Sequence, residues 1–210
     1  PIPERKRRSM FTWISKALCL TVLVALSGCQ LEPGFGGART APVLGGALQI
    51  GIPAGYCIDG GASRETRDGA VILMGRCTNE VKAIPALVSV SIGQGGSAGV
   101  MTAGGPALAA FFASKQGSAT LSRDGHASDI RIVEALGAGD AFLLHLQDRS
   151  MGEYWRAVIG LKGRLVTISA TGTPDLPLAA KDGRKVLDAT LDAMRRANGG
   201  TSPAKTVPKA

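Results

Sequence analysis

Three side chains in this sequence have the types and the order found in serine hydrolases. Ser97 lies at the centre of residues 95–99, which have the spacing G-x-S-x-G, and Asp140 and His145 follow it along the chain. Ser, Asp and His occur in this order in α/β-hydrolases. In that chemistry the histidine takes the proton of the serine hydroxyl, which attacks a carbonyl carbon.

The segments around these residues argue against such a site. A nucleophile elbow passes from a strand directly into a helix, but residues 100–105 separate Ser97 from the expected helix start at Pro106. His145 lies inside an apolar strand pattern, and a chain with 29 glycines matches a glycine-spaced motif easily by chance. The sequence therefore predicts a flexible loop at residues 95–105 and no catalytic residue. A small serine hydrolase using Ser97 is the alternative.

The first 29 residues have the order of a secretory signal. A basic stretch precedes a ten-residue apolar run over residues 17–26, which is too short to span a bilayer as a helix. The run ends in Leu26-Ser27-Gly28-Cys29, which resembles the lipobox of bacterial lipoproteins. By that resemblance, the thiol of Cys29 is acylated and the chain is cut in front of it, so Cys29 becomes the lipidated first residue.

The lipobox resemblance implies an anchor and a compartment. Acyl chains such as palmitate on Cys29 would supply about 0.8 kcal/mol per buried methylene, so no transmembrane helix is needed. The next residue is Gln30, whereas an Asp at this position retains lipoproteins in the inner membrane in the best-known sorting system. The resemblance therefore favours the outer membrane, with the protein facing the periplasm.

Removal of the signal also changes the charge. The whole chain has 24 Lys+Arg and 16 Asp+Glu, a formal net charge of +8. Five of these basic residues and one acidic residue lie within residues 1–28, so the mature chain would keep 19 and 15, a net charge of +4. The basic residues are dispersed and not interleaved with aromatic residues, so no nucleic-acid partner is expected.

Two cysteines are left once Cys19 is removed with the signal and Cys29 is acylated. Cys57 and Cys77 lie at or near the ends of two expected neighbouring strands, in a compartment where disulfides persist. Closing a loop of this length is worth roughly 3 kcal/mol in the chain-entropy model. The alternatives are free buried thiols or half of a metal site, although a zinc site needs more ligands. The sequence predicts a structural disulfide, with no metal or cofactor.

Strand patterns dominate the middle of the mature chain. Apolar residues alternate with polar ones, or form short runs, in residues 71–77, 86–92, 130–132, 142–146, 154–161 and 165–170. One helix is expected to start at Pro106, and a second places Leu187, Leu191 and Met194 on one face. Clustered strands with two separated helices predict an α+β fold, with a mostly antiparallel sheet packed by two or more helices.

The expected organisation is a single globular domain between two flexible ends. The composition, 45% hydrophobic and 19% charged, excludes a wholly disordered chain. Within the domain, the polar segment 59–69 is expected to be a solvated loop of mixed charge. The predicted parts are a signal peptide (1–28), a lipidated cysteine and flexible tether (29–48), the α+β domain (49–198) and a disordered tail (199–210).

Four short segments, spread over most of residues 50–197, resemble a group of uncharacterised bacterial lipoproteins. These are Gly55-Tyr56-Cys57-Ile58-Asp59, Leu73-Met74-Gly75-Arg76-Cys77, Tyr154-Trp155-Arg156 and Gly163-Arg164-Leu165-Val166. The group has no established activity. A cation-transport ATPase label that some members carry has no support here, because the sequence lacks an Asp-Lys-Thr-Gly motif.

The order of the expected elements is also similar to that of PsbP-like domains. These are extrinsic, membrane-associated proteins that act through binding, although a fold does not fix a function. The resemblance and the motifs predict a non-enzymatic lipoprotein that is held to the bilayer by acylated Cys29. It would serve as a binding or envelope-assembly accessory for an unidentified envelope protein or ligand. A small-ligand carrier with a groove near Tyr154 and Trp155 is a further alternative.

Overall fold

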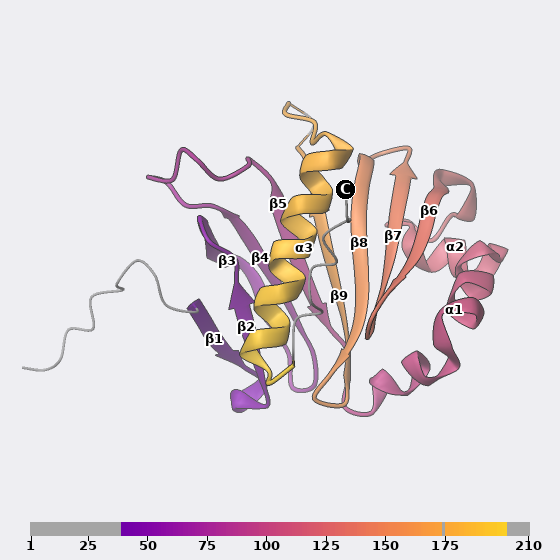
Figure 1. Cartoon of the computed structure of the whole chain (residues 1–210), viewed down its shortest axis with the longest axis horizontal. Coiled ribbons are helices and arrows are strands. Elements are labelled where there is room, and N and C mark those ends of the chain that lie inside the picture. Colours follow the sequence, from indigo (N-terminus) through magenta and orange to yellow (C-terminus); the bar gives the residue numbers. More distant parts are fainter. Residues whose placement is uncertain (1–38, 174, 201–210) are drawn as a thin grey trace, which may run out of the picture. The chain divides into compact units, whose positions relative to one another are not determined.

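The structure, a computed structural model, describes residues 39–173 and 175–200 and contains two antiparallel sheets (Figure 1). The smaller sheet pairs β1 (Arg39–Val43) with β2 (Leu48–Ile52). The larger has seven strands, in the order β3 (Tyr56–Glu65), β4 (Ala70–Arg76), β5 (Leu87–Ile92), β9 (Arg164–Thr171), β8 (Gly152–Leu161), β7 (Ala141–Asp148) and β6 (Ile130–Ala138). The predicted α+β class with a mostly antiparallel sheet is confirmed.

The helix α3 (Ala180–Ala197) covers one face of the large sheet, as Figure 1 shows. Its residues Leu187, Leu191 and Met194 are at most 2% exposed, as their spacing predicted. They share a core with every second residue of β4, β5, β9 and β8, because alternate side chains of a strand point to the same face. The last turn is fixed by buried Arg195, whose Nε donates to Asp140 Oδ1 at 3.0 Å.

The opposite face is covered over one half only. The helices α1 (Gly104–Ala113) and α2 (Lys115–Leu121) supply Leu108, Phe112 and Leu121 to a second core, which includes residues of β6, β7 and β8. This second core contains no residue of β3, β4 or β5. On the β3–β4–β5 half, Val71 and Leu87 are 43% and 40% exposed. We call this half of the face the open half.

The predicted tether is wrong for residues 39–48, which belong to the folded domain. They form β1, the turn η1 (Leu44–Gly46) and the first residue of β2, and Val43 and Leu48 are buried. Gly45 and Gly46 have positive φ angles, so these glycines serve a tight turn and not a flexible spacer. In β2, a Cβ at Gly51 would lie 2.1 Å from the backbone of Ala193, so only glycine permits this contact with α3.

The predicted helix at Pro106 and the predicted strands are present, with somewhat different bounds. The turn between β8 and β9 is a two-residue hairpin, with positive φ at Lys162 and Gly163. No helix within the described residues is long and apolar enough to cross a membrane. The predicted signal peptide, Cys29 and the tail beyond residue 200 lie outside the described residues.

Candidate functional site

A groove of about 440 Å³ lies on the open half of the sheet. Its floor is a cross-strand row in which Val71 of β4 is opposite Ser91 of β5, and Ser91 is opposite Thr167 of β9. One wall is the end of β3 with Arg64, which is opposite Val71, and the other is the turn η2 (Ser97–Ala103). Apolar atoms form most of the lining, and the volume is within the range of small-molecule sites.

Arg64 is placed beside the groove by a bulge in β3. Residues 60–63 of β3 stand opposite the single residue Ile72 of β4, because the register shifts between Asp59 and Arg64. The hydroxyl of Ser63 closes the gap by accepting a hydrogen bond from the N–H of Leu73 at 3.0 Å. The segment predicted as a solvated loop, 59–69, is therefore a strand with a bulge up to residue 65, and only residues 66–69 form a turn. Bulges commonly redirect a side chain at a functional site.

The bulge also fixes the guanidinium of Arg64. Its Nη1 donates to the carbonyl oxygens of Gly61 at 2.6 Å and of Ser63 at 2.8 Å. No carboxylate of the described residues lies within ion-pair distance of Arg64. The groove is therefore bordered by a positive charge whose position is set by the backbone.

A second arginine near the groove is neutralised. Arg164 Nη2 lies 2.7 Å from Asp68 Oδ1, and Arg164 Nη1 donates to the carbonyl oxygens of Asp68 and Gly93. The hydrogen bond from Arg164, aided by the N–H of Gly95, holds the pKa of Asp68 below its usual value, so Asp68 is ionised at neutral pH. This pair links the β3–β4 turn to β9 and leaves Arg64 as the uncompensated charge of the groove.

Ser97 lines the groove, but its hydroxyl is engaged by the backbone. Its Oγ donates to the carbonyl of Gln94 at 2.6 Å and accepts from the N–H of Leu165 at 2.9 Å. The bond to Leu165 attaches η2 to β9, and the bond to Gln94 closes the turn before η2, which explains why a serine stands in this glycine-rich segment. The segment predicted as a flexible loop contains the 3₁₀ turn η2, which is a wall of the site.

The structure does not bring His145 and Asp140 to Ser97. His145 lies on the face of β7 that packs toward α3, where it stacks on Trp155 with 4.4 Å between ring centroids. Asp140 is bound by Arg195 at the end of α3. Ser97 lies on the opposite face of the sheet, so the hydroxyl has no proton acceptor of the kind the hydrolase alternative requires.

The carrier alternative expected a groove near Tyr154 and Trp155, but both side chains are buried. These residues are 1% and 5% exposed, and they belong to the cores on opposite faces of β8. Burial raises the pKa of the Tyr154 phenol. Aromatic residues that were candidates for ligand contact are core residues, and the groove is lined by residues of β3, β4, β5 and β9 and by none of β8.

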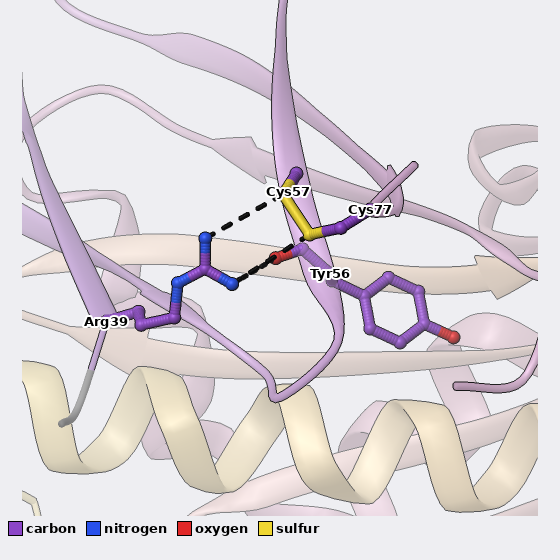
Figure 2. The surroundings of a disulfide bond; sticks show 4 residues. All are labelled: Arg39, Tyr56, Cys57 and Cys77. Carbon is purple, nitrogen blue, oxygen red and sulfur yellow. Dashed lines mark hydrogen bonds between the residues drawn. A yellow bond between two sulfur atoms is a disulfide. The ribbon is translucent and has the colours of Figure 1, made fainter. Parts of the chain in front are cut away.

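The predicted disulfide between Cys57 and Cys77 is confirmed, with Cα atoms 5.1 Å apart. Figure 2 shows the side chain of Arg39 reaching this bond from β1. Its Nη1 donates to the carbonyl of Tyr56 at 3.0 Å, and its two Nη atoms lie 3.9 and 3.7 Å from the sulfur atoms of Cys77 and Cys57. The disulfide joins β3 to the chain leaving β4, and Arg39 ties β1 to the same point.

Within residues 39–173 and 175–200, no three His, Cys, Asp or Glu side chains are grouped so that they could hold a metal ion. The sequence reasoning missed Arg64, Val71, Ser91 and Thr167 as site residues. Residues 71–74 are all apolar, so their pattern does not indicate which face of the sheet Val71 lies on. The bulge that positions Arg64 left no signal either.

No protein-family model matches the chain, and searches of curated proteins and of solved structures found none that is similar to it.

Proposed function

We propose that this protein is a lipid-anchored binding module of the bacterial envelope that holds an apolar ligand in the groove on its open half. The observation that carries the proposal is the groove itself, which is lined mostly by apolar atoms and lies on the half of the sheet face that α1 and α2 do not cover. An exposed apolar surface rimmed by polar groups is typical of interaction sites in soluble domains.

The N-terminal motif supports an anchor that keeps this groove near a membrane. The lipobox-like Cys29 precedes the first described residue, Arg39, by ten positions. Ten residues span at most about 35 Å whatever their conformation, so acylation of Cys29 would hold the folded domain close to the bilayer surface. Gln30 favours the outer membrane and a periplasmic position. A ligand drawn from the membrane would therefore reach the groove over a short distance.

The groove is tested with a neutral apolar fluorescent probe, N-phenyl-1-naphthylamine, added to the chain from residue 29 onward. Cys29 is replaced by serine here, so that acyl chains do not compete for the probe. We expect saturable binding of one probe per chain. Val71→Trp fills the floor of the groove and should weaken binding at least tenfold, as judged by the fluorescence titration.

The matched control is Val133→Trp on β6, because Val133 is 44% exposed and Val71 is 43% exposed. This control should bind the probe as the parent chain does. Absence of saturable binding by the parent chain, or equal binding by Val71→Trp, would exclude a ligand function for the groove.

The anchor is tested separately in cells. We expect the wild-type protein in the membrane fraction, with an N-terminal peptide whose mass shows an acylated Cys29. Cys29→Ala should lose both the acyl mass and the membrane association. An unmodified, uncut chain recovered from the cytosol would exclude the proposed anchor.

A further inference from the structure

We infer that the ligand of this groove is a single-chain anionic amphiphile, such as a fatty acid or a monoacyl phospholipid, whose anionic group binds Arg64. The inference rests on the proposed binding function and adds the chemical class of the ligand. Its source, free acid or phospholipid, is left to the experiment, because a carboxylate and a phosphate share the chemistry that a guanidinium recognises.

The groove has one charged end, and its lining is mostly apolar apart from the hydroxyl groups of Ser91 and Thr167 on its floor. Arg64, Val71, Ser91 and Thr167 are opposite one another in turn on β3, β4, β5 and β9. Neighbouring strands are about 4.8 Å apart, so this row is about 14 Å long. Leu165 lies at the far end beside η2 and adds to the apolar surface. A linear chain lying along the row would have its head at Arg64 and its tail at β9.

Arg64 is free to bind an anion. Both of its hydrogen bonds within the described residues use Nη1, which leaves Nε and Nη2 for a bidentate contact with two oxygen atoms. The two backbone carbonyls hold the guanidinium in place before a ligand arrives, which reduces the entropy lost on binding.

The nearby carboxylates do not compete for Arg64, since Asp59 Oδ1 accepts from the N–H of Ala62 at 3.0 Å and forms no ion pair with Arg64. Asp68 is occupied by Arg164 at 2.7 Å. Glu65 follows Arg64 on β3 and therefore points to the other face, where its Oε1 accepts from the N–H of Leu44 at 3.0 Å. The charge that a ligand meets at this end of the groove is positive.

The floor favours an alkyl chain over a peptide. The strands β4, β5 and β9 are each paired on both sides, so their backbone N–H and C=O groups are already bonded within the sheet. An extended peptide lying across them would leave its own backbone groups without partners, at a cost in free energy. An alkyl chain has no such groups, and each methylene that it buries contributes about 0.8 kcal/mol.

The test is displacement of N-phenyl-1-naphthylamine by laurate, by a twelve-carbon monoacyl phosphatidylglycerol and by neutral monolaurin, all below their micellar concentrations. The measured quantity is the ratio between the half-displacing concentrations of monolaurin and of each anion. We expect a ratio of about ten or more, because a charge-assisted bidentate contact is added only for the anions. Displacement by laurate but not by the phospholipid would identify a free acid as the ligand. Displacement by both anions would show that the groove recognises the anionic group that they share.

Arg64→Gln should bring this ratio to about one, and Arg64→Lys should keep part of it as a point charge. Arg67→Gln is the matched control, since Arg67 is a neighbouring exposed arginine that does not line the groove, and its ratio should equal that of the parent chain. Thermal unfolding followed by circular dichroism verifies that each variant is folded.

Each other outcome points to a different failure. If the probe binds but the parent chain shows no preference for the anions, or Arg64→Gln keeps the preference, the inference is wrong and the binding function stands. Displacement by an apolar peptide with a free C-terminus, without displacement by laurate, would also overturn it. If the probe does not bind at all, the proposed function itself fails.

Discussion

Val71 and Val158 lie on the same face of the sheet and in the same cross-strand row, yet 43% of Val71 and 4% of Val158 is exposed. Arg64, Val71, Ser91, Thr167 and Val158 follow one another across five strands. At the Val158 end, Leu108 and Phe112 of α1 pack in the same core as Val158 and bury the row. At the Val71 end no described helix does so, and the same row becomes the floor of a groove.

The path of the chain explains the difference between the two halves. After β5 the chain passes through η2, α1 and α2 before it returns at β6, the far edge strand. This crossover passes over β9, β8 and β7, so its helices cover only the half of the face on that side. In the β3–β4–β5 half the connections are residues 66–69 and 77–86, and neither contains a helix that could cover the face. The open half of this face carries Ser91 and Thr167 beside Val71, and the path of the chain leaves it without a covering helix.

The stability of the covered half should depend strongly on its aromatic contacts. Phe112→Ala removes a ring that is 9% exposed and stacks on Phe142 with 5.9 Å between centroids. We expect the free energy of unfolding to fall by about 3–5 kcal/mol, because the variant leaves a cavity under α1. Urea unfolding followed by circular dichroism measures it. Phe111→Ala, at a ring that is 42% exposed, should cost at most about 1.5 kcal/mol; equal losses would mean that α1 does not form the core described here.

The stability of the open half should depend instead on the disulfide between Cys57 and Cys77. The double variant Cys57→Ser and Cys77→Ser opens a loop with a sequence separation of 20 residues. It should lower the free energy of unfolding by roughly 3 kcal/mol, and amide hydrogen exchange should accelerate in β3 and β4 more than in β7 and β8. A reductant should destabilise the parent chain by a similar amount and leave the variant unchanged. Uniform acceleration over all strands would contradict a separate role for this half.

Tyr56, at the start of β3, should make stability fall in alkaline solution. Burial raises the pKa of its phenol to about 12, and the neutral hydroxyl donates to the carbonyl of Ile84 at 2.6 Å. The unfolded chain loses this proton near pH 10, so the stabilisation is fully present below pH 10 and is lost as the pH rises toward 12. Two pKa units correspond to roughly 2–3 kcal/mol.

Tyr56→Phe should remove most of this alkaline loss, measured as the free energy of unfolding in urea at several pH values from 9 to 11. A smaller slope should persist, because burial also raises the pKa of Tyr154. An identical alkaline loss in Tyr56→Phe and the parent chain would show that this phenol does not stay neutral in the folded protein.

The features that could be predicted from the sequence are those with a local signal. The helical spacing of Leu187, Leu191 and Met194 specified the face of α3 because an amphipathic helix needs no knowledge of its partners. The pairing of Cys57 with Cys77 followed from elimination and compartment. The class of the fold followed from the clustering of strand patterns.

The groove could not be predicted because it depends on which strands are neighbours. Arg64 and Val71 are close in sequence, but Ser91 and Thr167 join them only through the β5–β9 pairing. The bulge at residues 60–63 has the composition of a loop, so the strand around it was missed. In the same way, the glycines of η1 were interpreted as part of a flexible tether, although they form the turn of the β1–β2 hairpin. Local composition does not distinguish a turn inside a domain from a linker outside it.

The same substitution at Val71 and at Val158 tests directly whether the two halves of the face differ in burial. Val→Thr keeps the shape of the side chain and replaces a methyl group by a hydroxyl. At Val158 the hydroxyl would be buried under α1 in a core of apolar side chains. This should lower the free energy of unfolding by about 1–3 kcal/mol. At Val71 the hydroxyl faces solvent, so the change should be within about 0.5 kcal/mol. Urea unfolding of the two variants gives the difference directly. A loss at Val71 as large as that at Val158 would mean that another part of the chain covers the groove, and the open half would then be a core like its neighbour.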